Sequence, residues 1–334
     1  MNNNLAFVLG ASRSGTTWLA KIIDSHPDVL YRHEPDIPQT GPSLPLFCRQ
    51  DEVARHVDIA KASLRRYAHT RHVRATGVRP YFRKNYLSGL QAQTRESLIY
   101  CLRALERLPI GELAYRLAIP DFTSLDGALP LCLIKSVSSL GRINLLLQSH
   151  PGAKFIIIIR HPCGYVASRL RQPKVSSDWK SVGAGLPQAE QAERRGIGSA
   201  EIDAMSVLER LAWVWTIFNE KALEDCAANQ RVKVLRYEDL CIAPAQQARQ
   251  VLDFLGLDWQ PQTEQFVSAS TTQEKESSDY YSIVRDTSRE LEKWRNQLEH
   301  AQIQTIRSIV EDSLPGKLFL EGSDPLTQSE SRTS

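Results

Sequence analysis

The sequence predicts a doubly wound α/β fold, in which a mostly parallel central sheet carries helices on both faces. Short apolar runs of strand length alternate along the chain with longer segments whose apolar residues recur at helical spacing. One run, Phe155–Ile159, is continuous and rich in β-branched residues, as is typical of a parallel strand buried on both sides. Strands that alternate with helices indicate a parallel sheet built from crossover connections.

The elements follow in order from these patterns. Each expected strand is a short apolar run bounded by turn residues, and the four are Leu5–Leu9, Leu131–Lys135, Phe155–Ile159 and Val232–Leu235. The expected helices are Thr16–Ser25, Val207–Ala227 and Pro244–Leu255. The last has proline at its start and Gly256 after its end, which are common start and stop residues of a helix.

The chain is expected to form one domain over residues 1–321, followed by a polar, disordered tail at 322–334. Two long segments, 35–129 and 171–204, exceed the connections that a minimal α/β unit needs, so they are interpreted as substrate walls or a lid. Packing or solvated loop is the alternative for both. Aromatic residues of the first segment could line a substrate pocket or join the core: Tyr81, Phe82, Tyr86, Tyr100 and Tyr115.

Composition excludes several classes of protein. With 42% hydrophobic and 24% charged residues, the chain has the balance of a soluble globular protein. Its net charge of +3 does not argue for a nucleic-acid partner. No apolar run approaches the ~20 residues that span a bilayer, and no signal-peptide pattern is seen. The six cysteines form no C-x-x-C pair, so we expect reduced thiols, no cysteine metal site and a cytoplasmic location.

The first chemical motif is the segment Leu5–Trp18, which reads as strand, loop and helix. Gly10 and Gly15 have the spacing of a nucleotide P-loop, G-x-x-x-x-G-K-[ST]. Thr16 stands where the lysine should be, and Arg13 places a cation in the loop instead. Backbone N–H groups and the helix N-terminus can still hold phosphate oxygens. The alternative is a strand-to-helix turn that is merely rich in small residues.

The second motif is Arg160-His-Pro-Cys-Gly-Tyr-Val-Ala-Ser168, at the end of the clearest strand. Ligands of open α/β sheets bind at the carboxyl ends of the strands, and the planar guanidinium of Arg160 suits a phosphate. A Walker B strand would end in Asp, to hold Mg²⁺. The arginine therefore indicates a second phosphate in place of a metal.

Together these motifs resemble those of the sulfotransferases that use 3′-phosphoadenosine 5′-phosphosulfate (PAPS). Arg13-Ser-Gly-Thr-Thr-Trp18 resembles their 5′-phosphosulfate loop, Arg160…Ser168 resembles their 3′-phosphate motif, and Arg236-Tyr-Glu-Asp-Leu240 is also similar. The resemblance covers about residues 5–320 and is weak in the two long segments. It implies the P-loop-like sulfotransferase fold, PAPS as the donor, adenosine 3′,5′-bisphosphate (PAP) as the product, and no metal.

The resemblance also implies which residues hold the donor. Arg13 would contact the bridging and sulfuryl oxygens, and the next four residues would donate to the 5′-phosphate. Trp18 and Tyr237 would stack on adenine. Arg160 and Ser168 would hold the 3′-phosphate, and Arg285 would close over it. The full donor set is Arg13, Ser14, Gly15, Thr16, Thr17, Trp18, Arg160, Ser168, Tyr237 and Arg285.

The catalytic base departs from one branch of the family. The cytosolic branch has Lys-x-His on a central strand, where this chain has Lys135-Ser-Val137. Lys135 remains and could stabilise charge on the transferring group. Glu34 follows Arg13 by twenty-one residues, a spacing that resembles the catalytic Glu of the tyrosylprotein and carbohydrate branches. His33 is the rival base and Asp36 a weaker one, and Glu34 could also be a solvated acid.

The sequence thus predicts a sulfotransferase that acts by in-line transfer, with Glu34, Arg13 and Lys135 as its catalytic residues. The expected acceptor is a hydroxyl or amine of a small metabolite or soluble glycan precursor. The alternative function is an ATP- or GTP-dependent small-molecule kinase of the P-loop type, which the missing lysine and the strand-end arginine disfavour. A nucleotide-binding module without catalytic activity is a third hypothesis.

Overall fold

The computed structural model describes residues 4–37, 43–109, 111–123, 130–272 and 291–320. At its centre lies a five-stranded sheet in the order β2-β3-β1-β4-β5. Every neighbouring pair of strands is parallel. The strands are β1 (Leu5–Leu9), β2 (Val29–His33), β3 (Leu131–Ser136), β4 (Lys154–Ile159) and β5 (Val232–Arg236). The predicted doubly wound fold is confirmed.

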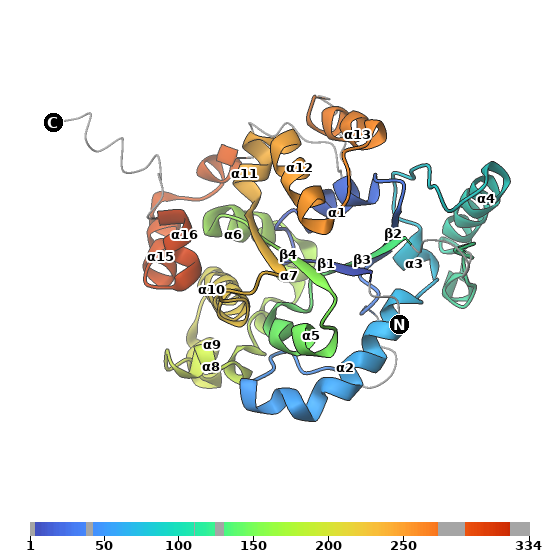
Figure 1. Ribbon diagram of the computed structural model, residues 1–334. Coiled ribbons are helices and arrows are strands. Elements are labelled where there is room, and N and C mark those ends of the chain that lie inside the picture. Colours follow the sequence, from blue (N-terminus) through green and yellow to red (C-terminus); the bar gives the residue numbers. More distant parts are fainter. Residues whose placement is uncertain (1–3, 38–42, 110, 124–129, 273–290, 321–334) are drawn as a thin grey trace.

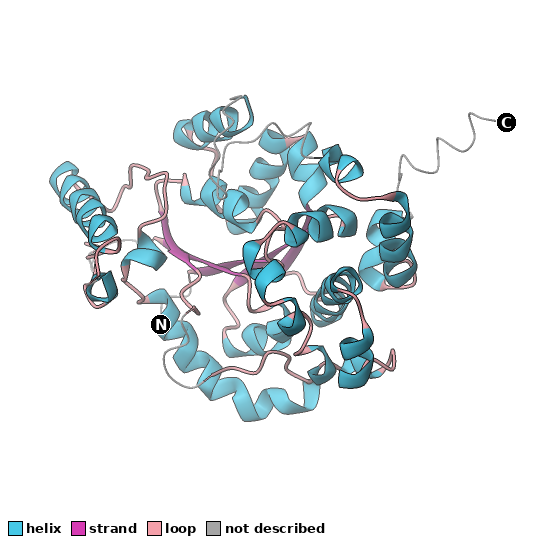
Figure 2. Cartoon of the chain, turned by 180° about the vertical axis from the view of Figure 1, so that it is seen from behind, coloured by secondary structure: helices cyan, strands magenta, loops and turns pink. Residues whose placement is uncertain are grey.

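Helices cover both faces of the sheet (Figures 1 and 2). One face is covered by α1 (Thr16–Asp24), α11 (Tyr237–Ile242), α12 (Pro244–Leu255) and α13 (Pro261–Thr272). The other is covered by α2 (Val53–Ala68), α5 (Ile143–Ser149), α6 (Pro162–Leu170), α10 (Val207–Asp225), α15 (His300–Val310) and α16 (Leu314–Leu320). The three helices expected from the sequence lie within two residues of their predicted ends.

The core reflects the alternation of side chains along each strand. In β1, Leu5, Phe7 and Leu9 face the α5 and α10 side, whereas Ala6 and Val8 face α1. Phe7 stacks on Phe155 of β4 with ring centroids 4.8 Å apart. Because both sides of β1 are buried, the strand that leads into the first motif is fixed in position and register.

The strand β2 was not among the strands expected from the sequence. Its residues Val29-Leu-Tyr-Arg-His33 end in two polar side chains, so no apolar run marks it. Arg32 is nevertheless fully buried, because its guanidinium lies 2.5 Å from the Asp121 carboxylate and also donates to the Ala68 carbonyl. The ion pair between Arg32 and Asp121 forms only when the chain folds. A hydropathy pattern therefore cannot show that this strand is buried.

Both long segments contain packed structure. The first contains α2, α3 (Val73–Thr76) and α4 (Gly89–Leu105); α3 and α4 share a small apolar cluster beside β2, and α4 stands out from the body in Figure 1. The second contains α7 (Pro173–Ser177), α8 (Glu190–Glu193) and α9 (Ser199–Ala204). Its apolar residues pack with Phe47 and with Ile217 of α10, so it is not a solvated loop. The tail 322–334 lies outside the described residues.

Two further expectations concern membranes and thiols. Within the part of the chain that the structure describes, no helix has the length and apolar character needed to cross a bilayer. All six cysteines are free, and five of them are buried, which agrees with the expected reduced thiols.

The strand order defines where a ligand can bind. The connection after β1 leads toward the β2 edge of the sheet, and the connection after β4 leads toward the β5 edge. The crevice between the carboxyl ends of β1 and β4 is therefore the topological switch point, where open α/β sheets bind their ligands. Both sequence motifs begin at this crevice.

Candidate functional site

The loop after β1 is built to receive an anion. Arg13 and Gly15 both have positive φ, 76° and 86°. Gly15 is the N-cap residue of α1 and provides no side-chain cap, and the first turn of α1 holds no acidic residue. The first N–H groups of a helix have no intrahelical acceptor, and they form its positive end. They are thus available to phosphate oxygens at the switch point.

Glycine is required at Gly15 for a second reason. A Cβ atom there would lie 2.6 Å from Cε2 of Tyr237, whose ring is fully buried. Gly10 is similarly close to its neighbours, since a Cβ would stand 2.6 Å from the Ile158 carbonyl oxygen. The two glycines of the P-loop-like spacing therefore allow the loop to pack directly against β4 and against the start of α11.

The two phosphate motifs contact each other. The Arg160 guanidinium donates to the Arg13 carbonyl at 3.1 Å, and Arg13 Nε donates to Ser168 Oγ at 3.0 Å. Trp215 Nε1 donates to the Arg160 carbonyl at 2.8 Å and anchors the end of β4. Arg13 and Arg160, which are separated by about half of the chain, thus lie together at one positively charged edge of the sheet.

Two arginines that the sequence analysis did not assign to the donor lie near Arg160. Arg236 is the last residue of β5, Arg160 directly follows β4, and Arg295 lies in a short 3₁₀ segment. Burial, helped by Arg295, Arg236 and Arg160, lowers the pKa of His161 to about 3. The Nε atoms of Arg236 and Arg295 are buried without a hydrogen bond. The signal that could have identified Arg236 is its strand-end position; nothing comparable marks Arg295.

Glu34 and Lys135 meet at the carboxyl ends of β2 and β3. The Glu34 N–H donates to the Lys135 carbonyl at 2.8 Å, and the Lys135 ammonium donates to the Glu34 carboxylate. Burial lowers the pKa of Lys135, while Glu34 opposes that shift. Strand alternation places Lys135 on the same face as Leu133, which packs with α1. The pair therefore lies on the face of the sheet where α1 and its loop begin.

Glu34 has φ 44° in left-handed backbone, as Arg13 has. Such conformations are costly for residues other than glycine and concentrate at functional sites. Among the described residues, four non-glycine positions have positive φ, and two of these are predicted catalytic residues. The backbone thus favours a functional role for both.

The rival bases have other partners. Burial and the nearby Lys135 lower the pKa of His33 to about 3, and its Nδ1 lies 2.7 Å from the Tyr31 hydroxyl. Asp36 is buried, accepts a hydrogen bond from Ser136 Oγ at 2.6 Å, and lies 3.8 Å from Arg142. A weakly basic imidazole and an enclosed carboxyl are poorer candidates than Glu34, whose side chain is 26% exposed.

The two aromatic residues expected to stack on adenine are in the core. Trp18 is 1% exposed, donates from Nε1 to Ser270 Oγ at 3.1 Å, and meets Tyr237 edge to face. Contrary to expectation, both rings are buried, and neither has a face exposed on which adenine could stack. Adenine stacking therefore stays a prediction, and it requires that the rings become exposed. Arg285 lies outside the described residues. No group of three or more metal-ligating side chains is found among the residues described.

Two partly buried histidines, His33 and His161, predict an acid-labile protein. For His33 and His161, a pKa of about 3 in the folded state, against an ordinary value of 6.5, means that only the unfolded chain binds a proton as the pH falls. The free energy of unfolding should then decrease by about 1.4 kcal/mol per pH unit for each histidine between these two pKa values. Urea unfolding at about pH 7 and about pH 5 measures this, and His161→Asn should reduce the difference. An unchanged difference would contradict the assignment.

Comparison with known proteins identifies similar sequences. The model of the Sulfotransferase family matches residues 6–261. Carbohydrate sulfotransferase 3 of Mus musculus is 27% identical over 161 residues, which are 46% of this chain and 31% of that protein. The protein of the same name from Rattus norvegicus is 27% identical over 162 residues, 47% and 31% of the two chains. The chain thus matches about a third of the length of these curated relatives.

Solved structures with similar chains are more distant. A sulfotransferase domain from the curacin biosynthetic pathway is 17% identical, with 91% of this chain and 95% of that chain covered and a TM-score of 0.42. A mouse sulfotransferase complexed with PAP is 12% identical, with 100% and 90% covered and a TM-score of 0.43.

Proposed function

Because the chain belongs to the sulfotransferase family, we propose that it transfers a sulfuryl group from PAPS to a hydroxyl or amine of an acceptor and releases PAP. The observation that carries this proposal is the contact between the two phosphate motifs. Arg160 binds the Arg13 carbonyl, and Arg13 binds Ser168, at the switch point of the sheet. A donor with two separate phosphate positions suits two cationic motifs that meet across one crevice.

The residues at the crevice fit such a donor. The uncapped start of α1 supplies N–H groups for the 5′-phosphate, and Ser14, Thr16 and Thr17 add hydroxyl groups. We assign the 3′-phosphate to Arg160, which directly follows β4, and to Ser168. Arg236 and Arg295 enlarge the positive charge near it. Planar guanidinium groups bind phosphate oxygens in pairs, which favours this assignment.

The chemistry is an in-line displacement at sulfur. Glu34 accepts the proton of the acceptor hydroxyl as the acceptor oxygen forms its bond to sulfur, and the bond between sulfur and the 5′-phosphate oxygen breaks. Lys135 and Arg13 stabilise the negative charge that develops on the bridging and sulfuryl oxygens. The products are the acceptor sulfate ester and PAP, and Glu34 holds the released proton.

The acceptor and the location are assigned less finely. The matches to carbohydrate sulfotransferase 3 support a glycan acceptor. A cytoplasmic location stays a prediction of the sequence.

The kinase alternative loses further support, because the chain belongs to the sulfotransferase family and Arg160 occupies the strand-end position of a Walker B aspartate.

Isothermal titration with PAP, beside ATP with Mg²⁺, tests the donor site. We expect the protein to bind PAP without added metal, and Arg160→Ala to weaken binding by about ten- to a hundredfold, since a hydrogen bond to a charged group contributes about 1.5–3 kcal/mol. Arg171→Ala is the matched control, because Arg171 is an exposed cation one residue beyond α6. Preference for ATP with Mg²⁺ and no PAP binding would favour the kinase instead.

A further inference from the structure

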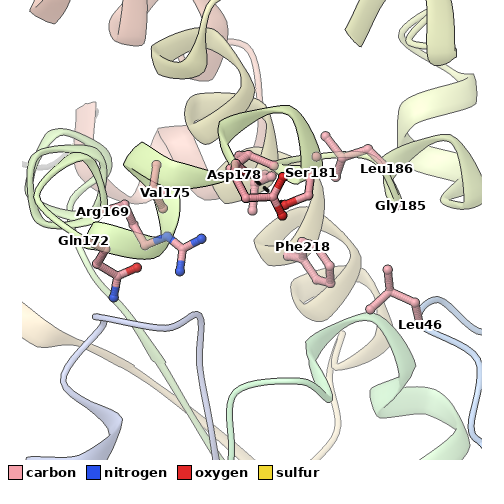
Figure 3. A pocket seen from close by; sticks show the side chains of 12 residues that line it. Leu46, Arg169, Gln172, Val175, Asp178, Ser181, Gly185, Leu186 and Phe218 are labelled. Atoms are coloured by element: carbon pink, nitrogen blue, oxygen red, sulfur yellow. Dashed lines mark hydrogen bonds between the residues drawn. The ribbon is translucent and has the colours of Figure 1, made fainter. Parts of the chain in front are cut away.

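A cavity of about 320 Å³ lies next to the donor motifs. Its apolar wall is formed by Leu46, Val175, Leu186, Val214 and Phe218, so α10 and the second long segment supply most of it (Figure 3). None of the aromatic residues proposed above as pocket walls lines it. Its volume is that of a small-molecule site, and polar groups line it together with the apolar wall.

The walls of this cavity are attached to the catalytic edge from two sides. Arg169, at the end of α6, directly follows Ser168, which accepts the hydrogen bond from Arg13. On the other side, the segment before Leu46 is held by Arg142, which follows β3 and donates to the Pro45 carbonyl at 3.0 Å. The cavity thus adjoins α6, which carries Ser168, and Arg142 connects its Leu46 wall to the segment that follows β3.

Arg169 contributes a half-buried cation to this cavity. It lies half-buried among the lining residues, and Figure 3 shows its guanidinium extending into the space between α6 and α10. Its Nε is buried without a hydrogen bond. Because Arg169 lines the cavity and its Nε has no hydrogen-bond partner, its guanidinium can donate to an anionic group of a bound molecule.

The cavity also contains one acidic residue, Asp178. Its side chain is exposed to solvent, whereas Arg169 is shielded. Water and salt screen an exposed charge much more than a buried one. The field that a bound molecule meets is therefore set mainly by Arg169.

Resting on the proposed sulfotransferase function, we propose that this cavity is the acceptor site and that it selects an acceptor bearing an anionic carboxylate, sulfate or phosphate group. Arg169 binds this group, and the apolar wall packs against the body of the acceptor. The acceptor hydroxyl is then presented toward Glu34 and the donor. Arg169 contacts the acceptor and takes no part in donor binding.

The test uses matched acceptors that differ only in charge. Two pairs serve: 4-hydroxyphenylacetic acid with its amide, and a glucuronic acid-containing disaccharide with its carboxyl-reduced form. We expect transfer from labelled PAPS to favour the acid of a pair, and Arg169→Gln to lower kcat/KM for the acid by about tenfold or more, as the loss of a charge-assisted hydrogen bond implies. PAP affinity should stay at its wild-type value, and Arg171→Gln should leave the preference unchanged.

Other outcomes overturn the proposal in distinguishable ways. If transfer to the neutral partner is equal or better, the acceptor class is not anionic. If the preference for the acid persists in Arg169→Gln, Arg169 does not select it. Both results contradict this proposal and leave the sulfotransferase function intact. If Asp178→Asn abolishes the preference for the acid, recognition depends on Asp178, and its assignment to Arg169 is wrong. Transfer to neither acid, with PAP binding intact, overturns the acceptor class alone. Absence of PAP binding overturns the proposed function, and this inference with it.

Discussion

Glu34→Gln is expected to lower kcat by about 10²- to 10⁴-fold, the usual contribution of a general base, while the affinity for PAP stays close to that of the wild type. The amide keeps the size and hydrogen-bonding reach of the carboxylate but cannot accept the acceptor's proton. Glu34 follows β2, on the same edge of the sheet as the donor loop, and its ion-pair partners are His33 and Lys135, neither of which we assign to the phosphates. Initial rates with a saturating acceptor and a separate PAP titration measure the two quantities.

A second readout separates catalysis from structure, because Glu34 also partners the buried Lys135. A general base produces a rising limb when kcat/KM is plotted against pH, and Glu34→Gln should abolish that limb. A merely structural role would lower activity by a similar factor at every pH. His33→Gln is the matched comparison. If Glu34→Gln keeps full turnover and His33→Gln does not, the imidazole is the base.

The sequence predicted well those features that local patterns encode. Phe155–Ile159 is so continuously apolar that its burial and parallel pairing follow from composition, and α12 begins at Pro244 and ends before Gly256 as predicted. The loop from Gly10 to Gly15 was recognisable because helix-start anion sites depend on local backbone. Its relation to Arg160 could also be predicted, since carboxyl ends of parallel strands share one edge.

The features that sequence reasoning missed depend on contacts between distant residues. Arg32 gives β2 a polar sequence, because its charge is neutralised only by Asp121, which lies 89 residues later in the chain. The burial of Trp18 depends on Ser270 of α13, which no motif connects to the donor loop. Arg169 is an ordinary helix arginine in the sequence, and only the fold shows that it lines a cavity and that its Nε has no hydrogen bond.

Gly15→Ala is expected to abolish measurable PAP binding and to destabilise the fold. At φ 86° an L-residue is strained by about 1–2 kcal/mol. The new Cβ would also displace the buried Tyr237 ring, and overpacking of this kind costs about 1–3 kcal/mol more. Tyr237 lies under the Arg160 guanidinium, 4.7 Å from its ring centroid, so its displacement moves a 3′-phosphate residue together with the loop that holds the 5′-phosphate. PAP titration and urea unfolding report on the two effects.

Gly196→Ala isolates the cause, since Gly196 has φ 66° but no atom within 4 Å of the position that a Cβ would take. It should show backbone strain alone, a loss of about 1–2 kcal/mol of stability with PAP binding unchanged. The difference between the two variants then measures the collision with Tyr237. Equal losses of stability and normal PAP binding in both would mean that the donor loop tolerates a side chain at Gly15, and that its contact with Tyr237 does not position the phosphate site.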